Sequence, residues 1–450
     1  MIYSMSLPKT ESKKIQFNNI LFYTYLAAML LCLVARNVWN MGIPVIFLLV
    51  LTAIPIFLGD TNHILAVAVC CLPFATGFQY KYAFFLCIIS LLWRNRFRFK
   101  RSVIWFIVLL LMFWELLHGF YPPFSFYEYL RNFAEFLLIA VVAQNIDQKN
   151  LDHKFIFRAY SVAVIGVCFI IFYLQLAMHG FSFGAMFSSD SFIRLGDDNT
   201  SYSNYGLNFN ANALGFVCNL AVAASLFLIN RRESSLFDII TMTLAAIFAM
   251  MTVSRTAILC LLLLIFGFIF FSPLKGNQKV KYIFRTVLLL LALFLALRFL
   301  IPGVFDSIVA RFGYDDVTNG RDQLFVFYNE HLFSSPLHFL FGIGQQSIQT
   351  KMIALYGSEY FGVCHSGFQE AMVCWGVLGL VLVLLLIGAI IYQTKSETKR
   401  PLSTFIPLIS WALYVASGQL VTSHTALTSL IFLIIFFSVR PKSDEKENEP

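Results

Sequence analysis

His365 is the residue whose surroundings most suggest acid–base chemistry. It directly precedes Ser366 and Gln369, which match a capping box: Ser at the N-cap and Gln three residues later. The positive end of a helix dipole disfavours an imidazolium, so a histidine there tends to stay neutral and can accept a proton from a hydroxyl group. Glu370, one turn along the same helix, could orient His365 or an acceptor. The alternative for His365 is a histidine that only caps or packs. The alternative for Glu370 is an ordinary first-turn acid.

Arginines form the second group of candidates. Arg255 follows Ser254 in a tight turn between two apolar runs, and Arg321 lies where a helix is predicted to start. A guanidinium at a helix start adds to the positive helix dipole, and its planar fork matches phosphate oxygens. Arg311 and Arg194 are weaker candidates for the same anion-binding role. The alternatives are snorkelling for Arg255 and an ion pair with a nearby aspartate for Arg321.

Segment 202–212 alternates asparagine with aromatic and small residues as it leads into a helix. Asn208 and Asn210 are candidates for contacts with a carbohydrate, because amides and amphipathic rings suit its hydroxyl groups and its apolar faces. The same composition suits an aromatic belt at a membrane interface. The sequence leaves both alternatives open.

The composition predicts an integral membrane protein. Of the 450 residues, 59% are hydrophobic and 12% are charged, whereas soluble domains carry about 25% charge. The net charge of +8 lies mostly in short loops, where Lys and Arg set orientation, so it requires no nucleic-acid partner. The nine cysteines have the spacing of neither a zinc site nor a disulfide framework.

The sequence contains no Walker A motif, dinucleotide fingerprint, His-Glu-x-x-His motif or cluster of metal-binding carboxylates. This argues against an ATP-driven pump and against a metal-dependent nucleotide-sugar transferase. We therefore expect neither a metal nor a cofactor. An ion-coupled transporter stays open.

The apolar runs predict an all-α, polytopic membrane fold with about 12–14 transmembrane helices, because a helix needs about 20 apolar residues to cross a bilayer. The clearest spans are 101–118, 155–178, 207–229, 236–253, 256–272, 282–300, 371–393, 403–420 and 425–439. Shorter or interrupted candidates are 18–34, 41–58, 63–79, 80–93 and 132–144. The lower count applies if two of the early runs are re-entrant or merged.

Basic clusters predict the orientation. They lie at 94–101, 149–158, 231–232, 275–285 and 395–400. Two spans separate each cluster from the next, so all fall on one side with both termini, and that side is predicted to be cytoplasmic. The opposite face carries the segments 119–131, 179–206 and 301–366.

The chain therefore divides into helices with short loops (1–300), a long external loop (301–366), C-terminal spans (367–440) and a cytoplasmic tail (441–450). The external loop has apolar periodicity between Leu324 and Leu332. This predicts short helices lying on the membrane surface.

Taken in order, several short motifs resemble those of one family. Ser254-Arg255 heads an apolar span, Gly320-Arg321 opens an aromatic-rich stretch, Ser335-Pro336-Leu337 leads to Gly342-Ile343-Gly344, and His365-Ser366 precedes Glu370, Gly376 and Gly379. This arrangement, mainly within 206–393, resembles the O-antigen polymerase and O-antigen ligase superfamily. The sequence departs from the family pattern at Ser366, where Asn is frequent, and at Asp322, an acid directly after the arginine.

The resemblance implies a GT-C-like bacterial glycosyltransferase, multi-pass in the inner (plasma) membrane, with a periplasmic or extracellular active face. Such enzymes pass a glycan from undecaprenyl pyrophosphate to a hydroxyl acceptor without a metal. By that similarity Arg255 and Arg321 hold the pyrophosphate, and His365 activates the acceptor. The implied partners are an undecaprenyl-pyrophosphate-linked oligosaccharide, membrane lipid, a chain-length regulator and a flippase.

Other functions stay open beside a polymerase, which extends a second lipid-linked repeat unit. A ligase would use lipid A core, but no distinctive basic docking surface for it is evident, which favours the polymerase. A lipid-linked oligosaccharide transporter would place ionisable residues near the bilayer midplane, often on broken helices. The candidate residues instead cluster at one surface and the spans are nearly free of charge, which favours an enzyme.

Overall fold

The structure of the chain is a computed structural model. It describes residues 18–74, 80–98, 102–120, 124–146, 148–182, 194–196, 207, 210–272, 275–300, 305–306, 309, 321–346, 348–357, 364–394, 405–421 and 423–439.

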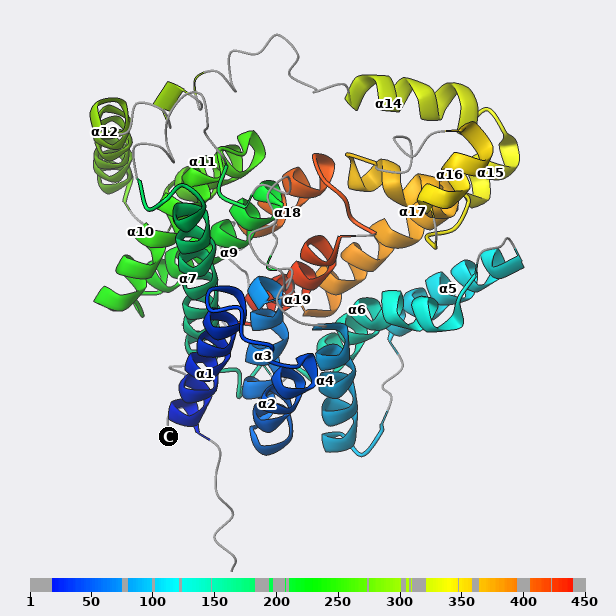
Figure 1. The fold of residues 1–450 in the computed structure, drawn as a ribbon, viewed down its shortest axis with the longest axis horizontal. Helices are drawn as coiled ribbons and strands as arrows, with labels where there is room; N and C mark the ends of the chain where they lie inside the picture. The colour runs from blue at the N-terminus through cyan, green and yellow to red at the C-terminus, as the bar shows by residue number, and fades with distance from the viewer. Residues whose placement is uncertain are drawn as a thin grey trace, which may run out of the picture.

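All regular elements in these ranges are helical, as predicted (Figure 1). The N-terminal half contains α1 (Asn19–Asn37), α2 (Val45–Leu58), α3 (Thr61–Phe74), α4 (Tyr80–Arg94), α5 (Val103–Leu117), η1 (His118–Phe120), α6 (Phe126–Asn145) and α7 (His153–Met178). The C-terminal half contains α9 (Ala211–Asn230), α10 (Leu236–Met251), α11 (Arg255–Phe270), α12 (Gly276–Leu300), α14 (Arg321–Phe327), η2 (Tyr328–Leu332), α15 (Pro336–Phe341), α16 (Ile348–Tyr356), α17 (Gly367–Thr394), α18 (Ile406–Ala416) and α19 (His424–Ser438).

Every apolar run that was predicted as a span coincides with one of these helices. Five of the described helical segments are long and apolar enough to cross a membrane: Asn19–Asn37, Val103–Phe120, His153–Met178, Ala211–Asn230 and Gly367–Thr394. Shorter apolar helices accompany them. The architecture is therefore compatible with a polytopic membrane protein.

Polar residues at the loop ends determine where several helices begin. The side chains of Asn18, Ser102, Ser125, Asp152 and Ser254 each accept a hydrogen bond from a backbone N–H in the first turn of the helix that follows. Such caps satisfy donors that have no partner within the helix. Long apolar runs therefore start as helices at defined positions.

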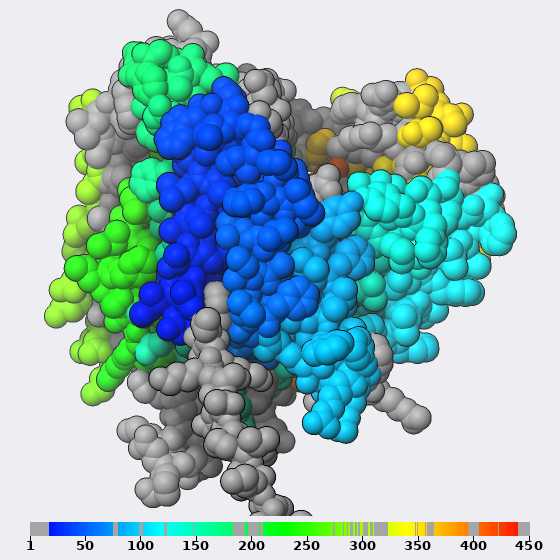
Figure 2. Space-filling view, turned by 60° about the horizontal axis from the view of Figure 1, so that its bottom comes forward, coloured from blue at the N-terminus to red at the C-terminus, as the bar shows by residue number. Residues whose placement is uncertain are grey.

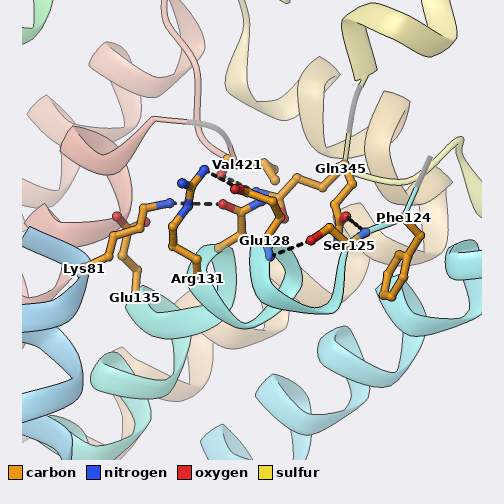
Figure 3. A pocket seen from close by; sticks show the side chains of 10 residues that line it. Lys81, Phe124, Ser125, Glu128, Arg131, Glu135, Gln345 and Val421 are labelled. Atoms are coloured by element: carbon orange, nitrogen blue, oxygen red, sulfur yellow. Dashed lines mark hydrogen bonds and ion pairs between the residues drawn. The ribbon is translucent and has the colours of Figure 1, made fainter. Parts of the chain in front are cut away.

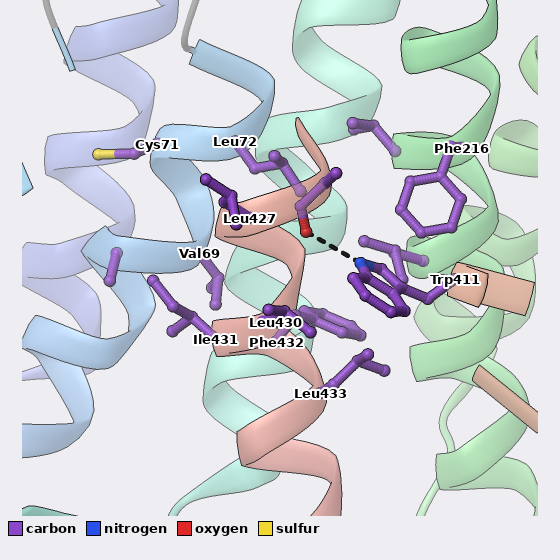
Figure 4. Close-up of a cluster of buried hydrophobic side chains, with 14 of the residues drawn as sticks. Val69, Cys71, Leu72, Phe216, Trp411, Leu427, Leu430, Ile431, Phe432 and Leu433 are labelled. Atoms are coloured by element: carbon purple, nitrogen blue, oxygen red, sulfur yellow. Dashed lines mark hydrogen bonds between the residues drawn. The ribbon is translucent and has the colours of Figure 1, made fainter. Parts of the chain in front are cut away.

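Three helices form the core around which the others pack. Nearly every residue of α3 and of α19 is buried, and most of α9 is buried as well. Figure 4 shows α19 between α3 and α9, with Trp411 of α18 donating from Nε1 to the Ala426 carbonyl at 2.9 Å. The Phe216 ring of α9 stacks on Tyr414, with 4.2 Å between ring centroids. Helices that are apolar on all sides are typical of such interior positions.

The outer surface is also apolar. Figure 2 shows the N-terminal helices, coloured from blue to cyan, side by side on one face. On these helices Ile46 is 65% exposed, Trp93 71% and Phe106 67%. Water would oppose so much exposed apolar area, whereas lipid tails would not. This surface supports the membrane prediction independently of helix length.

Helix α17 is interrupted at Gly376, whose φ is 69° and whose ψ is −174°. The break removes helical partners from nearby carbonyl groups, and other chain segments supply replacements. The N–H groups of Ile343 and Gly344 donate to the Val373 and Cys374 carbonyls at 2.9 and 2.7 Å. The Nε1 of Trp114 donates to the Trp375 carbonyl at 3.2 Å. Segment 342–344 is therefore held against α17 by backbone hydrogen bonds.

Glycine permits this close approach. A Cβ atom on Gly376 would lie 2.2 Å from the backbone C and O of Leu340, and one on Gly342 would lie 2.5 Å from the backbone of Cys374. Gly342 also has a φ of 76°, in the region that favours glycine. These two glycines explain why Gly342-Ile343-Gly344 and Gly376 belong to one structural unit.

The described part of segment 301–366 forms short helices, as predicted. Helices α14, η2, α15 and α16 lie together near the outer part of α17 (Figure 1). Leu324, Tyr328 and Leu332 are buried, whereas Phe325 and Val326 are exposed. Lys351 of α16 donates from Nζ to the Ile343 carbonyl at 2.7 Å. This contact ties the short helices to the segment that docks on α17.

Substitution of Gly376 by Ala should destabilise the protein, because a Cβ cannot fit against Leu340 and the backbone would be strained. Strain alone costs roughly 1–3 kcal/mol. Gly388→Ala, in the same helix, is the matched control, since a Cβ there meets nothing within 4 Å. It should be neutral or stabilise by up to about 1 kcal/mol. Thermal unfolding in detergent measures both; equal unfolding temperatures would contradict the docking described here.

Candidate functional site

Arg255 occupies the tight turn that the sequence predicts. It is the first residue of α11, and Ser254 is the N-cap. The Ser254 hydroxyl accepts from the Ala257 N–H at 3.2 Å and donates to Oδ1 of Asn212 at 2.7 Å. The start of α11 is thereby joined to the start of α9.

Arg194 and Asn210 lie at the same helix ends. Arg194 donates from Nε to the Thr252 carbonyl and from Nη2 to Oδ1 of Asn212, both at 3.0 Å. The side chain of Asn210 caps α9 and accepts from the Asn212 N–H at 2.9 Å. The structure thus brings Arg194, Asn210 and Arg255 to adjoining helix ends. Arg194 also orders the turn that carries Arg255.

His365 lies two residues before α17 and is half-buried. The helix begins at Gly367, which is consistent with Ser366 as the predicted N-cap. Glu370, in the first turn, is only 2% exposed. Its Oε2 accepts from the N–H groups of Leu420 and Val421 at 2.6 and 2.7 Å. Glu370 therefore orders the connection between α18 and α19 beside the start of α17.

Cys364, adjacent to His365, is buried. Burial, with the negative charge of Glu370 as a smaller cause, raises the pKa of the Cys364 thiol to about 12. Its Sγ donates to the Tyr328 hydroxyl at 3.4 Å. Only a thiolate is strongly nucleophilic, so the raised pKa disfavours Cys364 as a nucleophile.

Segment 417–421 connects the two groups of candidates. Thr256, next to Arg255, donates from Oγ1 to Oγ of Ser417 at 2.9 Å. A few residues later, Leu420 and Val421 bind Glu370. The starts of α9, α11 and α17 and the segment after α18 therefore form one hydrogen-bonded rim, which carries Arg194, Arg255 and His365.

The remaining predicted residues are not placed on this rim. Arg321 is the first described residue of α14, but its side chain lies outside the described part of the structure. Arg311 and Asn208 lie outside the described residues altogether. Their roles stay predictions.

A cavity of about 430 Å³ lies beside the rim (Figure 3). It lies between the first halves of α4 and α6 and two polar connections, segments 342–346 and 417–421. It is lined by Lys81, Phe124, Ser125, Glu128, Arg131, Asn132, Glu135, Gln345, Gln346 and Val421. Val421 also belongs to segment 417–421, so the cavity and the rim share one connection. Figure 2 shows the surface hollowed in the upper part of the view, between the N-terminal helices and the segment coloured yellow.

Both signs of charge meet in this cavity. Nζ of Lys81 donates to Oδ1 of Asn132 at 3.1 Å, and Arg131 forms an ion pair with Glu128. Glu135, halfway along α6, is only 2% exposed. In Figure 3 the side chains of Lys81, Arg131 and Glu135 lie on one side of the cavity and Gln345 lies on the other. Ionisable groups inside apolar helices are costly and usually functional.

A second buried carboxylate, Glu115 near the end of α5, holds the wall of the cavity. Its two oxygens accept from the N–H groups of Gln345 and Gln346 at 2.8 to 3.2 Å, and Oε2 accepts from Nε1 of Trp375 at 2.7 Å. Nε2 of Gln345 then donates to the Val421 carbonyl at 3.1 Å. Glu115 therefore links α5, the break in α17 and both polar connections.

These cavity residues were not predicted from the sequence. Glu115 and Glu135 are single acids inside the predicted spans 101–118 and 132–144, and the structure buries both. An isolated acid in an apolar run is the signal that could have found them. Gln345, Gln346 and Lys81 carry no comparable signal.

Comparisons with known proteins identify no relative: no family model and no curated protein matches this chain.

Replacing Glu115 by Gln should destabilise the protein, because an amide NH₂ would replace one acceptor that faces N–H donors. A buried donor left without its partner costs about 1–3 kcal/mol. Glu330→Gln is the control, since Glu330 is exposed on η2. Chemical or thermal unfolding in detergent compares the two variants. A Glu115→Gln protein as stable as the parent would show that the carboxylate is not needed to hold this wall.

Proposed function

We propose that this protein is a membrane glycosyltransferase that passes an undecaprenyl-pyrophosphate-linked glycan to a hydroxyl of a second lipid-linked repeat unit. The observation that carries the proposal is the hydrogen-bonded rim. It fixes Arg194, Arg255 and His365 on connected helix ends beside a polar cavity. The resemblance to O-antigen polymerases and ligases, made by short motifs, agrees with this choice of residues.

The topology that accompanies the proposal puts the rim and the cavity on the periplasmic or extracellular face. The basic loops then lie in the cytoplasm. Several of their charges are paired: Arg158 binds Asp238 with 2.7 Å between Nη2 and Oδ2, and His153 binds Glu233 at 2.8 Å. Burial opposes ionisation of Glu233, but His153 and Arg231 outweigh it and lower its pKa to about 2. These pairs join the start of α7 to the connection between α9 and α10 and to the start of α10.

In the proposed reaction His365 accepts the proton of the acceptor hydroxyl while its oxygen forms a bond to the anomeric carbon. The bond between that carbon and the pyrophosphate oxygen breaks, and undecaprenyl pyrophosphate leaves with the electron pair. Arg255 and Arg321 would stabilise the charge that develops on the leaving group. Fixed cations in a site of low dielectric constant do this well, because they need no reorganisation during the reaction.

An O-antigen ligase is the alternative within the same chemistry. It would use lipid A core as the acceptor, and the rim residues would keep their roles. We propose the polymerase, because no distinctive basic docking surface for lipid A core is evident in the sequence.

A lipid-linked oligosaccharide transporter is the candidate from another class, and two observations favour it. Helix α17 is broken at Gly376, and Glu135 is buried halfway along α6. Broken helices and ionisable groups near the midplane are typical of transporters.

Arg255→Ala, Arg321→Ala and His365→Ala should each abolish glycan transfer while the protein still inserts into membranes. Loss of a histidine base typically costs about 10²–10⁴-fold in rate, and loss of a charge-stabilising group about 10²–10³-fold. Arg298→Ala is the matched control, because Arg298 is also predicted at an outer helix end but pairs with Asp306 and is half-exposed. In the assay, purified protein in liposomes is supplied with undecaprenyl-pyrophosphate-linked repeat units. The products are then separated by size.

The products distinguish the candidates. A ladder of longer lipid-linked glycans that is lost in His365→Ala supports the polymerase. Transfer only after lipid A core is added supports the ligase. Movement of the lipid-linked glycan across the bilayer without any product supports the transporter. Normal glycan length and yield in both Arg321→Ala and His365→Ala would refute the assigned residues.

A further inference from the structure

The cavity contains buried polar atoms that have no hydrogen-bond partner among the described residues. They are Oε1 of Glu135, Oε1 of Gln345, Nε2 of Gln346 and Nε of Arg131. Glu135, Gln345 and Gln346 are 2%, 6% and 6% exposed. A buried polar group without a partner costs about 1–3 kcal/mol. Several such atoms lining one cavity indicate that a polar ligand completes their hydrogen bonds.

Backbone contacts fix which amide atom is unpaired. Gln345 donates from Nε2 to the Val421 carbonyl at 3.1 Å, so its Oε1 is the atom left over. Oε1 of Gln346 accepts from the Ser125 N–H at 2.9 Å, so its Nε2 is left over. Rotating either amide by 180° would break these bonds. The unpaired buried atoms that line the cavity are therefore two acceptors, from Glu135 and Gln345, and two donors, from Gln346 and Arg131.

This balance selects the chemistry of the ligand. A phosphate oxygen only accepts, so it would satisfy Gln346 and Arg131 but would be repelled by the oxygens of Glu135 and Gln345. A cation would have the opposite conflict. A hydroxyl group both donates and accepts, and a sugar carries several of them. The Phe124 ring, which also lines the cavity, adds an apolar surface, and 430 Å³ lies within the range of about 300–1,000 Å³ typical of small-molecule sites.

We propose that this cavity is a binding site for an uncharged sugar ring, held by Glu135, Gln345, Gln346 and Arg131. Its assignment to the acceptor sugar of the lipid-linked substrate rests on the proposed function. Val421 lines the cavity and binds Glu370 in the first turn of α17, next to His365. Two neighbouring regions then bind different parts of the substrates: the cavity binds hydroxyl groups, and the rim arginines bind the anionic leaving group.

Saturation-transfer NMR on the full-length protein in detergent tests this assignment. The probes are glucose, galactose, N-acetylglucosamine and rhamnose, with inorganic diphosphate as the anionic counter-probe. Gln346→Glu keeps the acceptor for the Ser125 N–H but turns the unpaired donor into an acceptor. Glu135→Gln makes the reverse exchange, from carboxylate to amide. Gln323→Glu, on exposed α14, repeats the amide-to-acid change away from the cavity.

At least one sugar should bind, and its affinity should fall about tenfold or more in Gln346→Glu and in Glu135→Gln, as expected for a lost hydrogen bond to a charged or buried group. Gln323→Glu should bind sugar normally. Unfolding temperatures show whether each variant is folded. If one of the two cavity variants does not fold, the other is enough for the test. Binding of no sugar, or displacement of sugar by diphosphate from the cavity, would overturn the proposal.

Failure of this inference and failure of the proposed function are distinguishable. If sugar binds as described but no glycan transfer occurs in any assay, the sugar site stands and the glycosyltransferase proposal fails. If the glycan ladder forms but sugar binding is absent or insensitive to both cavity variants, the glycosyltransferase stands and the sugar site fails.

Discussion

The buried carboxylate of Glu115 is the interaction on which the arrangement of α5, α17 and segment 342–346 depends. A carboxylate inside an apolar bundle is stable only when its oxygens accept several hydrogen bonds. Glu115 receives them from the N–H groups of Gln345 and Gln346 and from the indole of Trp375. These donors come from segment 342–346 and from α17, so one side chain of α5 determines how both approach the bundle. Glu370 repeats the device with Leu420 and Val421.

The two carboxylates act as one framework because their partners contact each other. Gln345, bound to Glu115 through its N–H, donates from its side chain to the carbonyl of Val421, whose own N–H binds Glu370. If Glu115 or Glu370 moved, the shift would pass through Gln345 and Val421 and would leave N–H groups unpaired at the other glutamate. The hydrogen bonds of this network should therefore form and break together. The same framework supports one wall of the cavity and the connection that joins α11 to α17. Recognition and chemistry in the proposed reaction would thus share a rigid support.

Apolar runs predicted the helices well, because a chain in lipid must satisfy its backbone hydrogen bonds internally and long helices do so. The turn before Arg255 also followed from local patterns. The break at Gly376 could not be predicted, since an isolated glycine in an apolar helix is usually tolerated and only the contact with Leu340 shows its purpose. The cavity was missed for a related reason: its lining comes from residues near 81, 131, 345 and 421, which no local pattern relates.

The break in α17 also bears on the choice between an enzyme and a transporter. In transporters with discontinuous helices, carbonyl groups exposed by unwinding bind the transported substrate or a coupling ion. Here the carbonyls of Val373, Cys374 and Trp375 already accept hydrogen bonds from Ile343, Gly344 and Trp114. The break is therefore filled by the protein's own chain, and it serves to dock segment 342–346 against α17. Because that segment supplies Gln345 and Gln346 to the cavity, the broken helix is better understood as the support of a fixed binding site than as an ion site, which favours the enzyme.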